Sequence, residues 1–164
     1  MLISAMKRVY NSRGLSLALR AVSHITAILS AAAFLYLLID AYLITPLYLL
    51  FPLFILGVPF VTVSLLRRFI NAPRPYELLD FYEEKPKNKS GRSFPSRHTH
   101  SVFSIATLLL FANPTLGAAL LLFGIALAVS RVLLGIHFLR DVIAGAIIGI
   151  LSSLIGVYIV SLFI

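Results

Sequence analysis

One stretch of the chain decides its fold class: residues 24–66, HITAILSAAAFLYLLIDAYLITPLYLLFPLFILGVPFVTVSLL, whose only charged residue is Asp40. A helix that crosses the hydrocarbon region of a membrane needs about 20 apolar residues. As one continuous helix the stretch would be about 65 Å long, which is enough for two crossings. We expect the break between Asp40 and Pro46, where a charge and a proline occur together.

The rest of the chain continues this pattern of long apolar runs. We expect helices at about 20–39, 46–66, 98–112, 115–134 and 140–164, of which 98–112 is short for a membrane span. Residues 1–19, with Lys7, Arg8 and Arg13, are typical of an interfacial amphipathic segment. A cleavable signal peptide is the rival interpretation, but Arg20 interrupts its apolar core. The sequence thus predicts one membrane-embedded domain over residues 1–164, an all-α bundle of about five spans.

Composition agrees with a membrane protein. Of the 164 residues, 60% are hydrophobic and 12% are charged, whereas a soluble domain has about half and a quarter. These values argue against a soluble globule and exclude a disordered chain. The absence of cysteine excludes a disulfide scaffold, a thiolate nucleophile and any cysteine-ligated metal.

The net charge of +8 could indicate nucleic acid, anionic lipid or an anionic substrate. The positions of the charges decide between these partners. No charge lies between Thr99 and Ser130 or after Asp141, so the basic residues are excluded from long apolar runs. A nucleic-acid binder would instead spread them over a soluble face. We therefore expect membrane lipids, and no nucleic acid, as partners.

Polar and ionisable residues gather at the ends of the expected spans and in the polar loop of about residues 67–97. With five crossings, the ends of the second and fourth spans and the starts of the third and fifth lie on one side of the membrane. We expect one site there, containing Arg67, Arg68, Arg74, Ser96, Arg97, His98, Ser130, Arg131, His137 and Asp141.

These residue types predict phosphate chemistry. Arginine presents a planar fork of donors that matches phosphate oxygens, and the helix start at Ser96 favours an anion. If one helix includes both His137 and Asp141, the carboxylate can orient the imidazole, whose other nitrogen can attack. His98, from another span, could protonate the leaving oxygen. Together they predict a phosphoryl-transfer site without metal or other cofactor.

The same residues resemble the type 2 phosphatidic acid phosphatase superfamily, whose signatures are Lys-x6-Arg-Pro, Pro-Ser-Gly-His and Ser-Arg-x5-His-x3-Asp. Arg67 and Arg74-Pro75 keep the spacing of the first signature, and residues 95–98, Pro-Ser-Arg-His, correspond to the second. Ser130-Arg131, His137 and Asp141 match the third at every position.

The resemblance implies a role for each matched residue. His137 would be the nucleophile that forms a phosphohistidine, Asp141 would orient it, and His98 would be the general acid. The phosphate would be held by Arg67, Arg74, Ser96 and Arg131. The family needs no metal, and its membrane members act on lipid phosphates and diphosphates. The expected substrate is phosphatidic acid, phosphatidylglycerophosphate or polyprenyl diphosphate, and the oligomeric state is open.

Three features depart from the family pattern. Arg67 replaces the usual lysine, which keeps the charge but changes the reach. Arg97 replaces the usual glycine and would be strained if that position had a positive φ. We expect that it does not, so that the Arg97 side chain can reach phosphate or a lipid headgroup. Family members commonly have six spans, whereas the sequence gives five.

Several other residues have simpler interpretations. His98 and His100 could suggest a metal, but on a helix they point about 200° apart and no carboxylate cluster joins them. His100 is then expected beside the site or a headgroup. His24, alone in its run, favours a buried, hydrogen-bonded structural role. Gly145 and Gly149 predict close helix packing. The basic run, Lys85, Lys87 and Lys89, is either a solvated loop or attracts anionic headgroups.

Two questions stay open at this stage. All 14 lysines and arginines lie on the side of the site, so the positive-inside rule places the site in the cytoplasm. Members of the resembled family generally face the outside or a lumen. As alternatives to a phosphatase, we consider an inactive lipid-phosphate-binding relative, suggested by Arg97, and a small anion channel or transporter, which would need charges at mid-depth.

Overall fold

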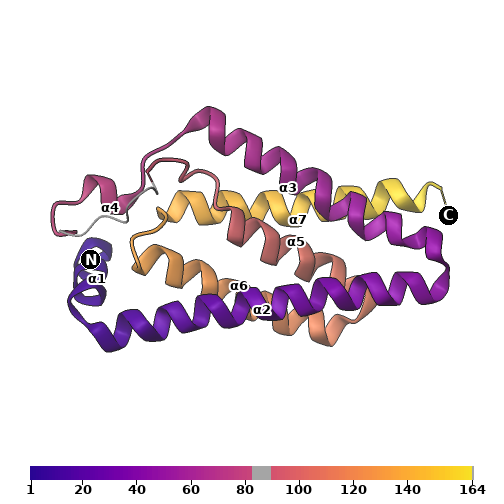
Figure 1. Cartoon of the computed structure of the whole chain (residues 1–164), viewed down its shortest axis with the longest axis horizontal. Coiled ribbons are helices and arrows are strands. Elements are labelled where there is room, and N and C mark those ends of the chain that lie inside the picture. The colour runs from indigo at the N-terminus through magenta and orange to yellow at the C-terminus, as the bar shows by residue number, and fades with distance from the viewer. Residues whose placement is uncertain (83–89, 164) are drawn as a thin grey trace.

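The computed structural model describes residues 1–82 and 90–163, which form an elongated bundle of helices without strands (Figure 1). The elements in chain order are α1 Leu2–Asn11, α2 Arg13–Ile44, the 3-10 turn η1 Pro46–Leu49, α3 Leu50–Ile70, α4 Pro75–Leu78, α5 Arg97–Ala112, α6 Pro114–Leu133 and α7 Leu139–Ser161. The predicted all-α polytopic bundle is confirmed. Lys85, Lys87 and Lys89 lie outside the described residues.

Four segments are long and apolar enough to cross a membrane: Arg13–Ile44, Pro46–Leu78, Pro114–Leu133 and Leu139–Ser161. The outer faces of these helices expose large apolar side chains such as Ile28, Phe54, Leu122 and Leu151. Helix α5 has 16 residues and is about 24 Å long, so it is the short helix that the sequence predicted. The chain is therefore a multi-pass integral membrane protein.

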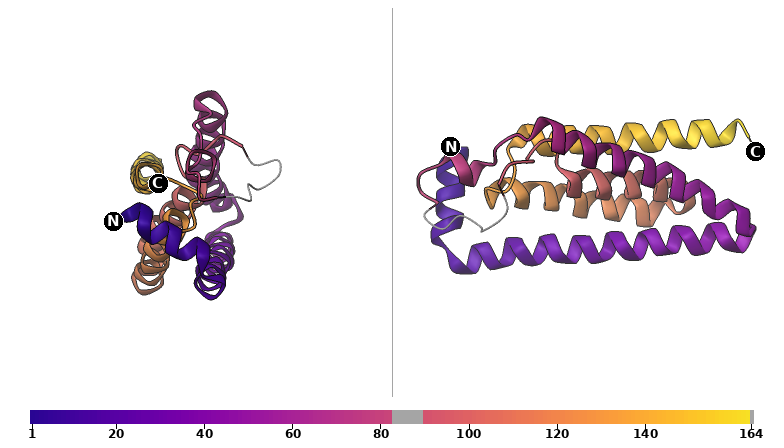
Figure 2. Two further views of the ribbon diagram at one scale, coloured as in Figure 1. Left: turned by 90° about the vertical axis from the view of Figure 1, so that its left-hand side faces the viewer. Right: turned by 45° about the horizontal axis from the view of Figure 1, so that its top comes forward.

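The N-terminal boundaries differ from the prediction. Helix α2 begins at Arg13, not near residue 20, because the hydroxyl of Ser12 accepts a hydrogen bond from the Leu15 N–H and caps it. Only α1 is separate, and it lies across the end of the bundle with Met6 and Val9 buried (Figure 2). The first two long helices separate at Thr45, inside the predicted interval.

Helix α5 lies against α7 at very short range. A Cβ atom on Gly145 would lie 2.5 Å from the carbonyl oxygen of Ser96, and one on Gly149 would lie 2.5 Å from that of His100. One turn further, the hydroxyls of Ser104 and Ser153 are 2.7 Å apart. The predicted small-residue packing is confirmed, and it fixes the start of α5 against the start of α7.

The N-terminus lies at the end of the bundle where α5 and α7 begin, and the C-terminus lies at the opposite end (Figure 1). At the C-terminal end, Asn113 accepts a hydrogen bond from the Leu116 N–H and Pro114 occupies the first position of α6. This cap turns the chain sharply between α5 and α6 and returns it to the end that carries the motifs.

Candidate active site

A cavity of about 690 Å³ lies at the motif-bearing end of the bundle. Of the eight residues with a predicted catalytic or phosphate-binding role, six line it: Arg67, Arg74, Arg97, His98, Arg131 and His137. They come from the end of α3, the residue before α4, the start of α5, the end of α6 and the turn before α7. The tertiary structure therefore brings segments far apart in the sequence to one place.

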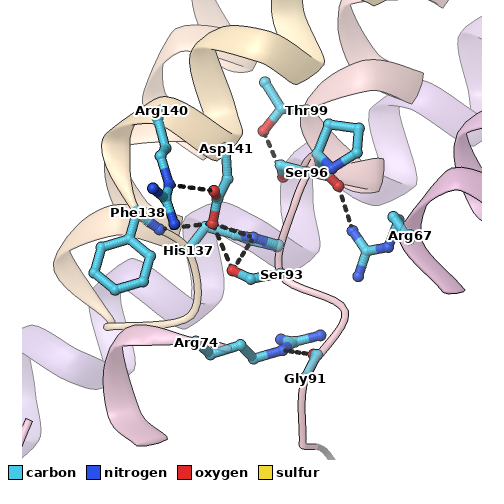
Figure 3. A network of polar contacts seen from close by, with 11 residues as sticks. Arg67, Arg74, Gly91, Ser93, Ser96, Thr99, His137, Phe138, Arg140 and Asp141 are labelled. Atoms are coloured by element: carbon cyan, nitrogen blue, oxygen red, sulfur yellow. Dashed lines mark hydrogen bonds and ion pairs between the residues drawn. The ribbon is translucent and has the colours of Figure 1, made fainter. Parts of the chain in front are cut away.

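His137 and Asp141 meet in a different way from the expected one. Helix α7 begins at Leu139, so His137 lies in the preceding turn and the two residues do not share a helical face. The Asp141 carboxylate, in the first turn, accepts a hydrogen bond from the Phe138 N–H at 2.9 Å. The same oxygen, Oδ2, lies 3.5 Å from Nδ1 of His137 (Figure 3). The helix cap therefore holds the carboxylate beside the imidazole.

His137 is buried, with 2% of its surface exposed. Burial lowers the pKa of His137, the hydrogen bond to Asp141 opposes that change, and the charges of Arg74 and Arg67 lower the pKa further. The neutral imidazole is the form that can attack phosphorus, so the environment favours the nucleophilic state.

Ser93 is a member of this network that the sequence analysis missed. Its hydroxyl donates to Oδ2 of Asp141 at 2.5 Å and lies 3.3 Å from Nδ1 of His137. Its backbone N–H donates to the Ala72 carbonyl at 2.8 Å, which fixes its position. No motif or spacing marks it in the sequence, and its closeness to Pro95-Ser96 is the only signal that could have drawn attention to it.

Ser96 and Asp141 are fully buried and do not line the cavity. The hydroxyl of Ser96 lies 3.0 Å from that of Thr99, and its N–H donates to the Asp141 carbonyl at 2.9 Å. In this structure Ser96 thus joins the starts of α5 and α7, and its predicted contact with phosphate stays a prediction.

Within residues 1–82 and 90–163, two of the arginines are each anchored through one N–H group. Nη1 of Arg67 donates to the Pro95 carbonyl at 2.7 Å, and Nε of Arg74 donates to the Gly91 carbonyl at 2.9 Å (Figure 3). The Gly91 N–H in turn donates to the Glu77 carboxylate at 2.7 Å. A guanidinium has five N–H donors, so both side chains keep donors for a ligand in the cavity.

Arg97 is not strained. It is the first residue of α5, and the only non-glycine residues with positive φ in the described ranges are Asn71 and Arg92. Its guanidinium lies 5.5 Å from the ring centroid of Phe60. Arg131, in the last turn of α6, has a buried Nε without a hydrogen-bond partner among the described residues. Both side chains are positioned to meet an anion.

The ring of Tyr82 packs against the turn that contains His137. Gly135 has φ of +69°, and a Cβ there would overlap the Tyr82 ring, so this position requires glycine. The Tyr82 ring contacts Tyr10 of α1 edge to face, with centroids 5.0 Å apart. Burial raises the pKa of Tyr82 to about 12. Helix α1 thus supports one wall of the site.

Of the remaining two histidines, His24 corrects an expectation, and the role predicted for His100 stays a prediction. His24 is exposed rather than buried, makes no hydrogen bond with a described residue, and lines the cavity of about 690 Å³ that also contains His137. His100 is 1% exposed and does not border that cavity. It lines instead an apolar cavity of about 290 Å³ formed by residues of α2, α3 and α5. No three His, Cys, Asp or Glu side chains within the described ranges form a cluster that could hold a metal.

The sequence-family model that describes the PAP2 superfamily matches residues 47–163 of this chain. The chain belongs to this superfamily. All three motifs lie inside the matched region, as the sequence resemblance implied.

Two bacterial relatives are similar to parts of the chain. The bacitracin transport permease protein BcrC of Bacillus licheniformis is 31% identical over 101 residues, which are 59% of this chain and 50% of that protein. The undecaprenyl-diphosphatase BcrC of Bacillus subtilis strain 168 is 32% identical over 79 residues, 48% of this chain and 40% of that protein. The chain therefore spans half the length or less of these curated relatives.

Two crystal structures share the fold over nearly the whole chain. LpxE of Aquifex aeolicus superimposes with a TM-score of 0.71 and 26% identity, covering 95% of this chain and 94% of that one. The PAP2-type phosphatidylglycerolphosphate phosphatase of Bacillus subtilis gives a TM-score of 0.64 and 22% identity, covering 96% and 83%. At 22% identity, the similarity to the Bacillus subtilis phosphatase shows only that the two proteins share a fold.

Proposed function

We propose that this PAP2 protein is an integral membrane phosphatase that hydrolyses lipid phosphate monoesters or diphosphates through a phosphohistidine. The observation that carries the proposal is the position of His137, which lines a cavity with the four motif arginines while Asp141 and Ser93 lie behind its Nδ1. The relative undecaprenyl-diphosphatase BcrC, by its name, acts on a lipid of one of these classes.

In the proposed reaction, Nε2 of neutral His137 attacks phosphorus, and the bond from phosphorus to the leaving oxygen breaks. The leaving oxygen keeps the electron pair and takes a proton from His98. The carboxylate of Asp141 stabilises the positive charge that develops on the imidazole, and the arginines stabilise the charge on the phosphoryl oxygens. Water then attacks the phosphorus of the phosphohistidine while His98 takes a proton from that water. The bond between phosphorus and Nε2 breaks, which releases inorganic phosphate and returns His137 to its neutral form.

The apolar cavity supports a lipid as the substrate. Phe60 lines this cavity, and its ring contacts the guanidinium of Arg97. Arg97 in turn lines the cavity that contains His137. A lipid whose phosphate meets the arginines could therefore place part of its chain beside Phe60 and Ile105. An anion channel is not favoured, because the charge of Asp40 lies near a helix end and the described spans carry no charge at mid-depth.

Phosphate release by the purified protein in detergent tests the proposal. The substrates are phosphatidic acid, phosphatidylglycerophosphate and undecaprenyl diphosphate, each with EDTA present. We expect release that EDTA does not abolish and that His137→Ala lowers by at least about a thousandfold. Equal release by wild type and His137→Ala contradicts the nucleophile assignment. No release from any lipid favours the inactive binding relative.

A further inference from the structure

A group of residues on α2 lines the catalytic cavity opposite the motifs: Ser16, Arg20, Ser23 and His24. Their spacing places them on one face of the helix. They lie outside residues 47–163, which the family model matches. The function proposed above assigns none of them a role, so the cavity has a polar wall that the family motifs do not explain.

This wall contains polar groups that the protein leaves without partners. The Ser23 side chain is buried, with 5% exposed, and its hydroxyl has no hydrogen-bond partner among the described residues. A buried hydroxyl without a partner costs about 1–3 kcal/mol, so a ligand atom is the expected partner. Arg20 and His24 form no ion pair with any described residue.

The cavity is large enough for more than one anionic group. Its volume of about 690 Å³ is typical of pockets that hold a drug-sized ligand, far more than a single phosphate fills. One wall carries His137 and the motif arginines, and the other carries Arg20 and His24. Arginine side chains on two walls of one cavity repel each other unless anions lie between them.

We propose that Arg20, Ser23 and His24 form a second phosphate subsite, which holds the phosphate attached to the lipid in a lipid diphosphate. The inference rests on the proposed function and adds a substrate class to it. The terminal phosphorus is attacked by His137, and its bond to the bridging oxygen breaks. The bridging oxygen keeps the electron pair and takes a proton from His98. Lipid monophosphate remains on α2, and water later releases inorganic phosphate.

The position of α2 suits this role. Arg20 and Ser23 lie near the N-terminal end of α2, a helix long and apolar enough to span a membrane, and this is the end of the bundle that carries the motifs. Arginine and serine side chains both donate hydrogen bonds, and the guanidinium fork matches phosphate oxygens. A lipid monophosphate has no group for this subsite when its phosphate lies at His137. The subsite therefore predicts a preference for diphosphates.

Steady-state hydrolysis of farnesyl diphosphate and farnesyl phosphate tests the subsite, because the two substrates share one chain. We expect Arg20→Gln and Ser23→Ala to raise KM for the diphosphate about tenfold or more. KM for the monophosphate should change less than about twofold. Arg13→Gln, an exposed residue of the same helix outside the cavity, is the matched control and should change neither.

The other outcomes overturn the subsite. Equal losses for both substrates would mean that Arg20 and Ser23 only support the fold. No change for either would mean that no phosphate contacts them.

A binding measurement separates this inference from the proposed function. His137→Ala protein is titrated with farnesyl methylenediphosphonate and with farnesyl phosphonate, which cannot be hydrolysed, and thermal stabilisation is recorded. The subsite is supported if the diphosphonate binds more tightly than the monophosphonate and if Arg20→Gln abolishes this difference. This result would support the subsite even if the wild type hydrolyses no lipid. Equal binding of both ligands, or a preference that survives Arg20→Gln, overturns it even if the wild type is an active phosphatase.

Discussion

The hydroxyl of Ser93 lies 2.5 Å from Oδ2 of Asp141, although 48 positions separate the two residues in the sequence. The same hydroxyl lies 3.3 Å from Nδ1 of His137, closer than the 3.5 Å between that nitrogen and the carboxylate. Ser93 thus stands between the proposed nucleophile and the group that orients it. We interpret Ser93 as a positioning residue for His137.

Ser93→Ala should lower kcat about 10- to 100-fold with little change in KM, because a buried hydrogen bond to a charged group is lost. Single-turnover formation of the phosphoenzyme should slow by the same factor. Ser152→Ala is the control, because it removes a hydroxyl on α7 whose one hydrogen bond within the described residues is to the Gly149 carbonyl. An unchanged kcat in Ser93→Ala would show that Asp141 positions His137 alone.

The imidazole of His137 should titrate below its ordinary pKa of about 6.5. Burial and the charges of Arg74 and Arg67 lower this pKa, so the ring stays neutral and nucleophilic in mildly acidic solution. Protonation at still lower pH removes the attacking lone pair and the activity with it. Histidine resonances of the detergent-solubilised protein, assigned with His137→Gln, measure the midpoint directly.

Arg74→Gln removes a positive charge that disfavours the imidazolium, so it should raise the pKa of His137. Arg68→Gln, an exposed neighbour that does not line the cavity, should leave the midpoint in place. A wild-type midpoint at or above 6.5, or a downward shift in Arg74→Gln, is incompatible with this account.

Gly145→Ala should destabilise the protein by about 1–3 kcal/mol, because the added methyl would lie 2.5 Å from the Ser96 carbonyl oxygen. Separation of α5 from α7 there would also displace His98 and lower activity. The matched control is Gly57→Ala in α3, where an added Cβ meets no atom within 4 Å. Thermal unfolding in detergent compares the two, and an equal effect would show that α5 and α7 can separate without cost.

Gly57→Leu should fill part of the apolar cavity and weaken binding of long-chain substrates. Exclusion of two or three methylene groups corresponds to about a 10- to 50-fold rise in KM. A substrate with a five-carbon chain should be unaffected, so the ratio of KM values for long and short chains is the measured quantity. A rise in KM that is the same for both chains would mean that the lipid chain lies elsewhere.

The side of the membrane that the site faces follows from two single-cysteine proteins, since the chain has no cysteine of its own. Lys7 and Thr115 are exposed at opposite ends of the bundle. The positive-inside rule predicts that an impermeant thiol reagent labels Thr115→Cys in intact cells and labels Lys7→Cys only after permeabilisation. The reverse pattern would place the site on the outer surface.

Much of the architecture can be read from the sequence. The apolar runs predict the helices, and the break before Pro46 and the turn at Asn113-Pro114 predict antiparallel neighbours, because such patterns depend on local composition alone. Because successive spans cross the membrane in opposite directions, the three motifs are also predicted to share one end of the bundle. This prediction places Arg67, His98, Arg131 and His137 together. The start of α2 was misplaced because the cap at Ser12 gives a weaker signal than hydrophobicity.

Other features were decided only by the tertiary structure. The pairing of His137 with Asp141 across a helix cap, the position of Ser93 and the cavity wall formed by Arg20, Ser23 and His24 depend on how separate helices meet. No local sequence pattern predicts such contacts. In an apolar helical run, the sequence around an exposed histidine does not differ from that around a buried one. The sequence by itself determined a membrane bundle with phosphate-binding motifs at one end. The packing of α2, α5 and α7 decided which side chains face the cavity, since contact depends on distances that only the folded chain establishes.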